Sequence, residues 1–164
     1  MALRTLPTIV CTEDFTVCIN SEGELFSFGY SDCNAHGHEE DANEICPPKV
    51  ISSFCKIKTF DASSSHSVCL SFDGSVYAFG SSTCGQLGIG ENDDNCFKPQ
   101  KVNIPPCKQV SCGGFFTICL TEDGVLYSFG YNGNGELGLG NNENYYTPQL
   151  ISSLKDVEFI ECGG

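Results

Sequence analysis

An internal repeat of about 50 residues constrains the fold of this 164-residue chain more than any other feature. The turn glycines of the repeat, Gly23, Gly74 and Gly124, lie 51 and 50 residues apart. A period of this length is typical of proteins that stack supersecondary units, each of which buries its apolar surface against its neighbours. The repeated strings align almost without gaps and read FTVCINSEGELFSFG, HSVCLSFDGSVYAFG and FTICLTEDGVLYSFG.

Each repeat predicts a hairpin whose strands are covered on both faces. Two short apolar runs flank a Glu-Gly or Asp-Gly turn, and this pattern is a strong hairpin signal. In the second repeat Val68 and Leu70 lie on one face and Ser67 and Cys69 on the other, so neither face carries the charges of a solvated sheet. A glycine-rich loop, a proline and a further short strand follow. The pattern predicts an all-β chain, a partial β-propeller of about three four-stranded blades with a repeat period of 50–51.

The repeat divides the chain into a lead-in strand and three units. The four segments are 1–14, 15–64, 65–114 and 115–164. The last unit ends at Cys162-Gly163-Gly164, which matches Cys112-Gly113-Gly114 at the start of another unit. Three blades do not close the usual ring, and closure is what removes exposed edges from a propeller. We therefore expect a segment of a larger propeller, or self-association through the open ends.

The same units resemble the repeat of the regulator-of-chromosome-condensation family. The likeness is plainest from Val110 to Ile151, which carries Cys-Gly-Gly, an Asp-Gly turn, an aromatic residue before glycine, GELGLG and a later proline. The second unit matches through His66-Ser67, Asp73-Gly74 and GQLGIG, and the resemblance covers about residues 9–164. Kelch repeats have a similar period but fit this loop poorly. The family's usual tryptophan is a phenylalanine at the three equivalent positions, Phe28, Phe79 and Phe129.

The resemblance implies a protein-protein interaction module without a catalytic constellation. The activity it suggests is guanine-nucleotide exchange on a Ran-like small GTPase, which grips the GTPase and displaces its nucleotide without covalent chemistry. Alternatives are a partner-binding propeller segment of a larger ubiquitin ligase or kinase, and a structural fragment without independent activity. On this basis we expect a non-enzyme with no cofactor.

Charge and cysteine content narrow the partners and the compartment. The net charge is -13, and nucleic-acid affinity comes mostly from Lys and Arg, so we expect no direct DNA binding, whereas basic histones fit. No apolar run approaches the roughly 20 residues of a membrane helix, and the start lacks a secretory apolar stretch. The 12 cysteines could all pair, but without a visible signal peptide or CxxC we expect free thiols and an intracellular location, cytoplasmic or nuclear.

Acidic loops recur at the same place in each repeat and should share one face. They form either a solvated rim or a negative surface that steers a basic partner. In the first unit the glycine-rich loop reads NAHGHE, with His36 in place of leucine and His38 in place of Ile89 or Leu139. We interpret these loops as partner contacts. The candidate residues are His36, His38, Glu39, Glu40, Asp41, Glu91, Asp93 and Asp94.

Metal and phosphate sites have weaker support. Cys33, His36, His38 and Cys46 could form a tetrahedral zinc set, but Cys33 has a counterpart in Cys84 that has no histidine beside it. The acidic strings lack the regular spacing of calcium ligands. GQLGIG and GELGLG lack the helix that a phosphate-binding loop requires, so they are interpreted as turns packed between blades. We expect no metal.

Catalytic roles for the thiols and for His66 are also disfavoured. Most cysteines recur at fixed repeat positions, which indicates packing, whereas a reactive thiol needs a base and a lowered pKa. His66 belongs to the repeat, and we expect it to satisfy hydrogen bonds of the blade backbone. The sequence therefore predicts no catalytic residue.

Overall fold

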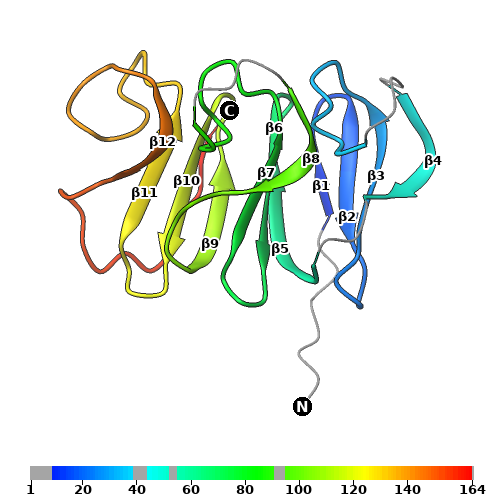
Figure 1. The fold of residues 1–164 in the computed structure, drawn as a ribbon, viewed down its shortest axis with the longest axis horizontal. Helices are drawn as coiled ribbons and strands as arrows, with labels where there is room; N and C mark the ends of the chain where they lie inside the picture. Colours follow the sequence, from blue (N-terminus) through cyan, green and yellow to red (C-terminus); the bar gives the residue numbers. More distant parts are fainter. Residues whose placement is uncertain (1–8, 39–43, 52–54, 91–94, 164) are drawn as a thin grey trace.

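Three small antiparallel sheets stand side by side in a computed structural model of the chain (Figure 1). The structure describes residues 9–38, 44–51, 55–90 and 95–163. These residues contain twelve strands and no helix, so none of their segments is a helix that could cross a membrane. The all-β architecture with four-stranded blades confirms the fold prediction.

Each blade is a meander in which consecutive strands are hydrogen-bonded neighbours. Blade 1 contains β1 (Ile9–Cys11), β2 (Phe15–Ile19), β3 (Leu25–Tyr30) and β4 (Glu44–Val50). Blade 2 contains β5 (Ile57–Ala62), β6 (His66–Ser71), β7 (Val76–Gly80) and β8 (Cys96–Lys101). Blade 3 contains β9 (Cys107–Cys112), β10 (Phe116–Thr121), β11 (Leu126–Gly130) and β12 (Tyr145–Leu150).

The sheets are offset from the repeat units of the sequence. Strand β5 lies within residues 15–64, yet it pairs with β6 of the following unit, and β9 pairs with β10 in the same way. The last strand of each of the first two sequence units is thus the first strand of the next blade. This offset ties neighbouring blades together, because these two units each contribute to two sheets.

Glycine sets the hairpin turns and the junction with the outer strand. Gly74 has a φ of 81°, and its amide donates to the Ser71 carbonyl at 3.1 Å, which closes the Asp-Gly turn. At Gly80, where φ is 108°, an added Cβ would lie 2.7 Å from the Ser65 carbonyl oxygen. The register of β7 against β8 also shifts between Ala78 and Gly80. The outer strand therefore turns away at a position that only glycine fills easily.

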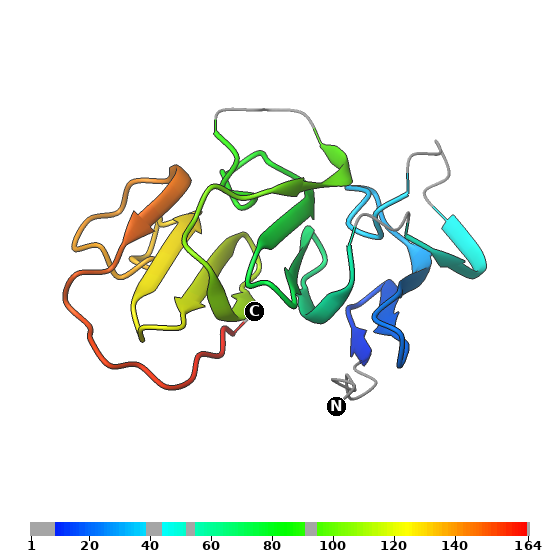
Figure 2. The same cartoon turned by 60° about the horizontal axis from the view of Figure 1, so that its bottom comes forward.

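Most of the apolar core lies in the seams between blades, and a smaller cluster packs within blade 3 and the segment after it. One cluster joins blades 1 and 2 and includes Phe15, Ile51 and Phe79, and a second joins blades 2 and 3 and includes Leu87 and Phe129. Figure 2 shows the outer strands β4, β8 and β12 at the periphery, with the last residues of the chain returning beside β9. Since each seam needs two blades, the blades stabilise one another.

Candidate functional site

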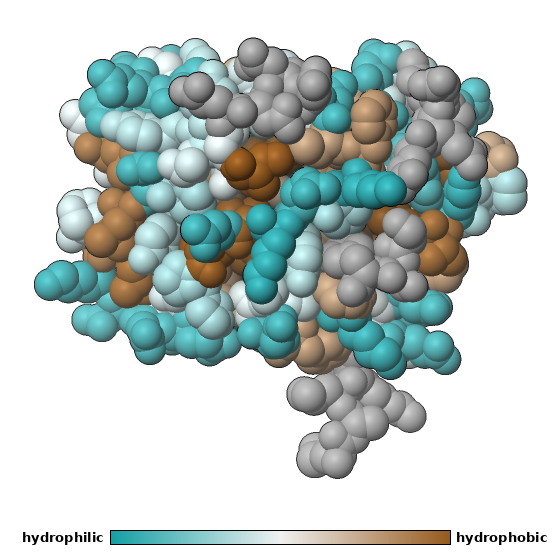
Figure 3. All heavy atoms as spheres, in the orientation of Figure 1, coloured by the Kyte–Doolittle hydropathy of each residue, from teal (hydrophilic) through white to brown (hydrophobic). Residues whose placement is uncertain are grey.

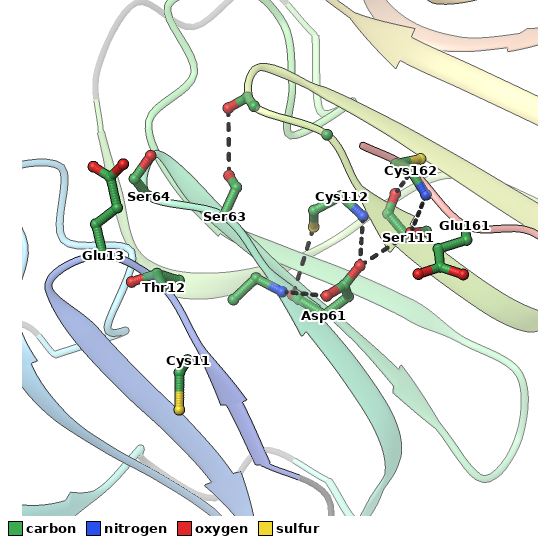
Figure 4. Close-up of a pocket in the computed structure, with 13 residues that line it drawn as sticks. Cys11, Thr12, Glu13, Asp61, Ser63, Ser64, Ser111, Cys112, Glu161 and Cys162 are labelled. Carbon is green, nitrogen blue, oxygen red and sulfur yellow. Dashed lines mark hydrogen bonds between the residues drawn. The ribbon is translucent and has the colours of Figure 1, made fainter. Parts of the chain in front are cut away.

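The innermost strands β1, β5 and β9 and the turns that follow them surround a pocket of about 610 Å³ (Figure 4). The end of the chain, after β12, closes one side of this pocket. Its lining is mostly hydroxyl, carboxylate, thiol and glycine. The residues that line it are Cys11, Thr12, Glu13, Asp61, Ala62, Ser63, Ser64, Ser111, Cys112, Gly113, Gly114, Glu161 and Cys162.

A polar side chain at the same repeat position accepts hydrogen bonds from the innermost strand, or its equivalent, in the next blade position. The Asp61 Oδ2 atom accepts hydrogen bonds from the Cys112 amide at 2.8 Å and from the Ser111 hydroxyl at 3.1 Å. One blade further on, the Ser111 Oγ atom accepts from the Cys162 amide at 3.0 Å. This ladder of hydrogen bonds between the innermost strands was not predicted from the sequence. The signal was a polar residue directly before the recurring cysteine at 111 and 161, with Asp61 at the same register.

The pocket carries negative charge. Glu13, Asp61 and Glu161 line it, and no Lys, Arg or His is among the described residues of the lining. Glu13 and Glu161 are exposed, whereas Asp61 is half-buried and engaged by β9. A concave surface with carboxylates and no basic side chain favours cationic groups of a partner over phosphate.

Two thiols of the pocket, those of Cys112 and Cys162, are held in their neutral form. Burial, followed by the charge of Asp61, raises the pKa of Cys112 well above its usual value. Burial also raises the pKa of Cys162. The twelve cysteines, all among the described residues, form no disulfide. A thiol that stays protonated near neutral pH is a poor nucleophile, so these residues act here as packing groups.

His66 is a fully buried titratable group, two residues after the pocket-lining Ser64. The Thr117 hydroxyl donates to the Gln86 carbonyl at 2.8 Å, so it accepts from His66 Nε2 at 2.8 Å. His66 Nδ1 accepts from the Ser63 hydroxyl at 3.0 Å. Burial lowers the pKa of His66 to about 3, so the ring is neutral. The side chain bonds hydroxyl groups, and through Thr117 on β10 it links blade 2 to blade 3, whereas we expected bonds to the blade backbone.

Two of the predicted partner-contact residues are buried in the seam between blades 1 and 2. His36 is 0% and His38 4% exposed. The Ser27 hydroxyl donates to the His36 carbonyl at 2.6 Å, so it accepts from His38 Nε2 at 2.8 Å. A partner would therefore meet other parts of this loop. The other candidates, Glu39, Glu40, Asp41, Glu91, Asp93 and Asp94, lie outside the described residues, and their role stays a prediction.

The residues considered for zinc are not assembled into a site. Cys33 is half-buried and Cys46 exposed, whereas His36 and His38 are buried. Within the described residues, no three or more His, Cys, Asp or Glu side chains are placed to hold a metal ion.

The four-stranded blades repeat, pack through glycine-rich loops and place their innermost strands around one polar pocket. These features define a β-propeller repeat protein. The family model for the regulator of chromosome condensation (RCC1) repeat matches residues 73–120 and 123–164, and a second RCC1 repeat model matches 57–86 and 107–136. The chain belongs to the RCC1 repeat family.

Several relatives share this similarity over part of their length. The chain is 35% identical over 160 residues to the mitochondrial RCC1 domain-containing protein RUG3 of Arabidopsis thaliana, which covers 91% of this chain and 36% of RUG3. It is 32% identical over 104 residues to the kinase Nek9 of Xenopus laevis, which covers 62% and 11%. It is 39% identical over 79 residues to the regulator of chromosome condensation of Xenopus laevis, which covers 48% and 19%. The chain thus spans about a third or less of these relatives.

Solved structures agree on the fold. Prp20p of Saccharomyces cerevisiae superposes with a TM-score of 0.85 at 24% identity, over 99% of this chain and 42% of Prp20p. That structure was described together with the binding of Prp20p to Gsp1p and histones. Human WBSCR16 superposes with a TM-score of 0.82 at 21% identity, over 96% of this chain and 43% of WBSCR16. The three blades therefore correspond to less than half of each solved propeller.

Proposed function

We propose that this RCC1-type repeat chain is a protein-interaction module. It binds a partner with its loops and with the pocket between its innermost strands, here called the axial pocket. The observation that carries the proposal is how the repeat is used. Recurring residues such as Phe79, Phe129 and Gly88 are buried in the seams, whereas the exposed turns differ from blade to blade. Because the repeat builds the scaffold, recognition falls to the exposed residues that do not recur.

The charge of the axial pocket supports a basic partner segment. Glu13 and Glu161 are exposed at this pocket, and Asp61 lies between them. A net charge of -13 adds a long-range attraction for a basic surface and repels nucleic acid. A lysine- or arginine-rich segment, such as those that histones expose, has the chemistry that fits.

The specific activity we propose is regulation of a Ran-like small GTPase by nucleotide exchange. The family membership, the similarity to the Xenopus regulator of chromosome condensation and the fold shared with Prp20p support it. Exchange requires only a surface that stabilises the nucleotide-free GTPase. The reaction therefore needs no nucleophile, metal or cofactor from this chain, in keeping with the neutral thiols and the neutral His66.

An exchange assay tests the activity and separates it from binding. The purified chain is added to a Ran-type GTPase loaded with fluorescent GDP, with full-length regulator of chromosome condensation as positive control. We expect faster GDP release, together with a saturable signal in a parallel binding titration. Binding without faster release would refute exchange but keep the interaction module. If the chain neither binds this GTPase nor speeds GDP release, the proposal is refuted for this GTPase.

A second candidate is a propeller region that regulates a larger kinase. The 32% identity to Nek9 over 104 residues supports it. The test adds the chain to the isolated Nek9 kinase domain and measures phosphate transfer to a peptide. A change in rate that rises with chain concentration would support this candidate, and an unchanged rate would remove it.

We also propose an intracellular, reducing location, cytoplasmic or nuclear. Twelve cysteines that form no disulfide fit such a compartment. The relative RUG3 carries a mitochondrial designation, so the compartment differs among family members. Fractionation of cells that express a tagged chain would test the location, and recovery from the secretory pathway would contradict it.

A further inference from the structure

The two internal seams have the same construction. We call residues 34–38, 85–90 and 135–140 the knob loops of blades 1, 2 and 3. The socket of each blade consists of one hydroxyl residue, one phenylalanine and one glycine on its central hairpin. In both seams the knob loop of one blade enters the socket of the following blade. The sockets are Thr16, Phe28 and Gly29 in blade 1, Ser67, Phe79 and Gly80 in blade 2, and Thr117, Phe129 and Gly130 in blade 3.

In the seam between blades 1 and 2, three contacts fix the knob loop in its socket. The Ser67 hydroxyl donates to the Ala35 carbonyl at 2.7 Å. A Cβ on Gly37 would lie 2.8 Å from the Phe79 ring, so glycine lets the loop rest on the aromatic face. A Cβ on Gly80 would lie 3.2 Å from the Ala35 Cα.

The seam between blades 2 and 3 repeats these contacts. The Thr117 hydroxyl donates to the Gln86 carbonyl at 2.8 Å. A Cβ on Gly88 would lie 2.7 Å from the Phe129 ring, and one on Gly130 would lie 3.2 Å from the Gln86 Cα. Two occurrences of the same geometry define what a knob loop and a socket require of each other.

Among the described residues, each end of the row of blades presents one unfilled half of this seam. Gly138 is exposed, although its counterparts Gly37 and Gly88 are buried, and a Cβ on Gly138 would meet only Ile151 among the described residues, at 3.8 Å. At the other end, Thr16 and Phe28 are half-buried. Their counterparts in the filled sockets of blades 2 and 3 are fully buried: Ser67, Phe79, Thr117 and Phe129. Figure 1 places these blades at opposite ends, and Figure 3 shows apolar surface at both flanks.

We propose that a second copy of this chain docks head to tail, its blade 1 socket receiving the knob loop of blade 3. The socket supplies each required group. Thr16 brings the hydroxyl for the Glu136 carbonyl, Phe28 brings the ring for Gly138, and Gly29 permits the close approach. The interface is heterologous, so it can continue from copy to copy, as a ring if the rotation between copies closes and as an open chain if it does not.

The strand after blade 3 takes part in this docking. The Gln109 side chain brackets Ile160, donating to its carbonyl at 2.6 Å and accepting from its amide at 3.1 Å. Residues 160–162 thus occupy the place where the innermost strand of a following blade belongs. They read Ile-Glu-Cys, and β1 reads Ile-Val-Cys. In the docked pair, residues 160–162 pair with β2 of the second copy in place of its β1.

Two substitutions that leave the folded chain intact test the docking. Asn tolerates positive φ, so Gly138→Asn fits the loop as it stands, but in a filled seam its side chain would strike Phe28. Thr16→Arg points a guanidinium into solvent in the single copy and would bury it in a pair. We expect wild type to self-associate in sedimentation equilibrium up to about 100 μM, where a Kd of about 1 μM would fill most sites. Each variant alone should lose this association.

The mixture of the two variants is the decisive arm. Gly138→Asn keeps an intact socket and Thr16→Arg keeps an intact knob loop, so an equimolar mixture should form a one-to-one dimer and no larger species. Gly140→Asn is the matched control, because a Cβ added to Gly140 or to its counterpart Gly90 would have no described atom within 4 Å. A monomeric wild type, variants that still associate, or a mixture that stays monomeric would each overturn the proposal.

Discussion

The seam between blades 1 and 2 and the seam between blades 2 and 3 share one backbone geometry but differ in chemistry. Blade 2 fills its knob loop with Leu87 and Ile89, and blade 1 fills the same places with His36 and His38. Leu87 and His36 are both fully buried. The comparison teaches that the glycines and the carbonyl contacts fix the path of the loop, whereas the side chains behind it can be apolar or hydrogen-bonded imidazoles.

The aromatic of the socket should show the largest difference between a filled and an unfilled seam. Phe129 is fully buried, whereas Phe28 is half-buried. Phe129→Ala should lower the free energy of unfolding by about 3–5 kcal/mol, because it leaves a cavity in the seam. Phe28→Ala should cost clearly less. Urea unfolding of both variants at a concentration where the chain is monomeric measures the difference. Equal losses would contradict the assignment of Phe28 to an open seam.

Acid should weaken the seam that contains His66. The pKa of His66 is about 3 in the folded chain, below its usual value of 6.5, so between these values the unfolded chain binds more protons. This contribution to stability is complete above pH 6.5 and is lost as pH falls, by about 2 kcal/mol at pH 5.

The variant His66→Phe isolates this effect, because Phe15 and Phe116 occupy the equivalent positions. Denaturant unfolding of wild type and variant at pH 7 and pH 5 gives the comparison, since the two proteins share every titratable group except His66. We expect the variant to lose about 2 kcal/mol less on acidification. A parallel decline of the two proteins would show that His66 does not titrate in this range.

The sequence predicted the scaffold better than the site, and the reason is physical. Turn glycines such as Gly74 and apolar strands such as 68–70 act locally, so their spacing reveals the blades. The axial pocket depends on Asp61, Ser111 and the end of the chain, which meet only when blades pack. His36 was predicted to be an exposed contact residue because polar side chains usually stay in water. It is buried because the Ser27 hydroxyl donates to its carbonyl and the His38 amide donates to its ring Nδ1, so its polar groups have partners.

The axial ladder gives a smaller contrast between the two blade junctions. Asp61 accepts two hydrogen bonds from β9, whereas Ser111 accepts one from Cys162. Asp61→Ala should cost about 1–3 kcal/mol, since it leaves the Cys112 amide without its charged acceptor. Ser111→Ala should cost about 1 kcal/mol or less. Thermal unfolding of both variants tests the order, and a larger loss for Ser111→Ala would reverse our view of which junction the carboxylate secures.

The smallest predicted effect is a gain. In blade 3, the Asn132 side chain accepts from the Leu137 amide at 2.9 Å and donates to the Asn141 carbonyl at 2.9 Å. In blade 2 the equivalent residue is Ser82, whose buried hydroxyl has no hydrogen-bond partner among the described residues. Ser82→Asn should supply an acceptor for the Leu87 amide, as Asn132 does for the Leu137 amide. We expect it to raise the free energy of unfolding by about 1 kcal/mol.

Blade 1 provides the matched control for this gain. Its equivalent residue, Ser31, already accepts from the Ala35 amide at 3.0 Å. Ser31→Asn should therefore bring no gain, and differential scanning calorimetry of the two variants separates the cases. A lower melting temperature for Ser82→Asn would mean that the loop of blade 2 has no room for the amide. The loops of blades 2 and 3 would then differ in backbone as well as in side chain at residue 82, so the shared geometry of the seams would not include this position.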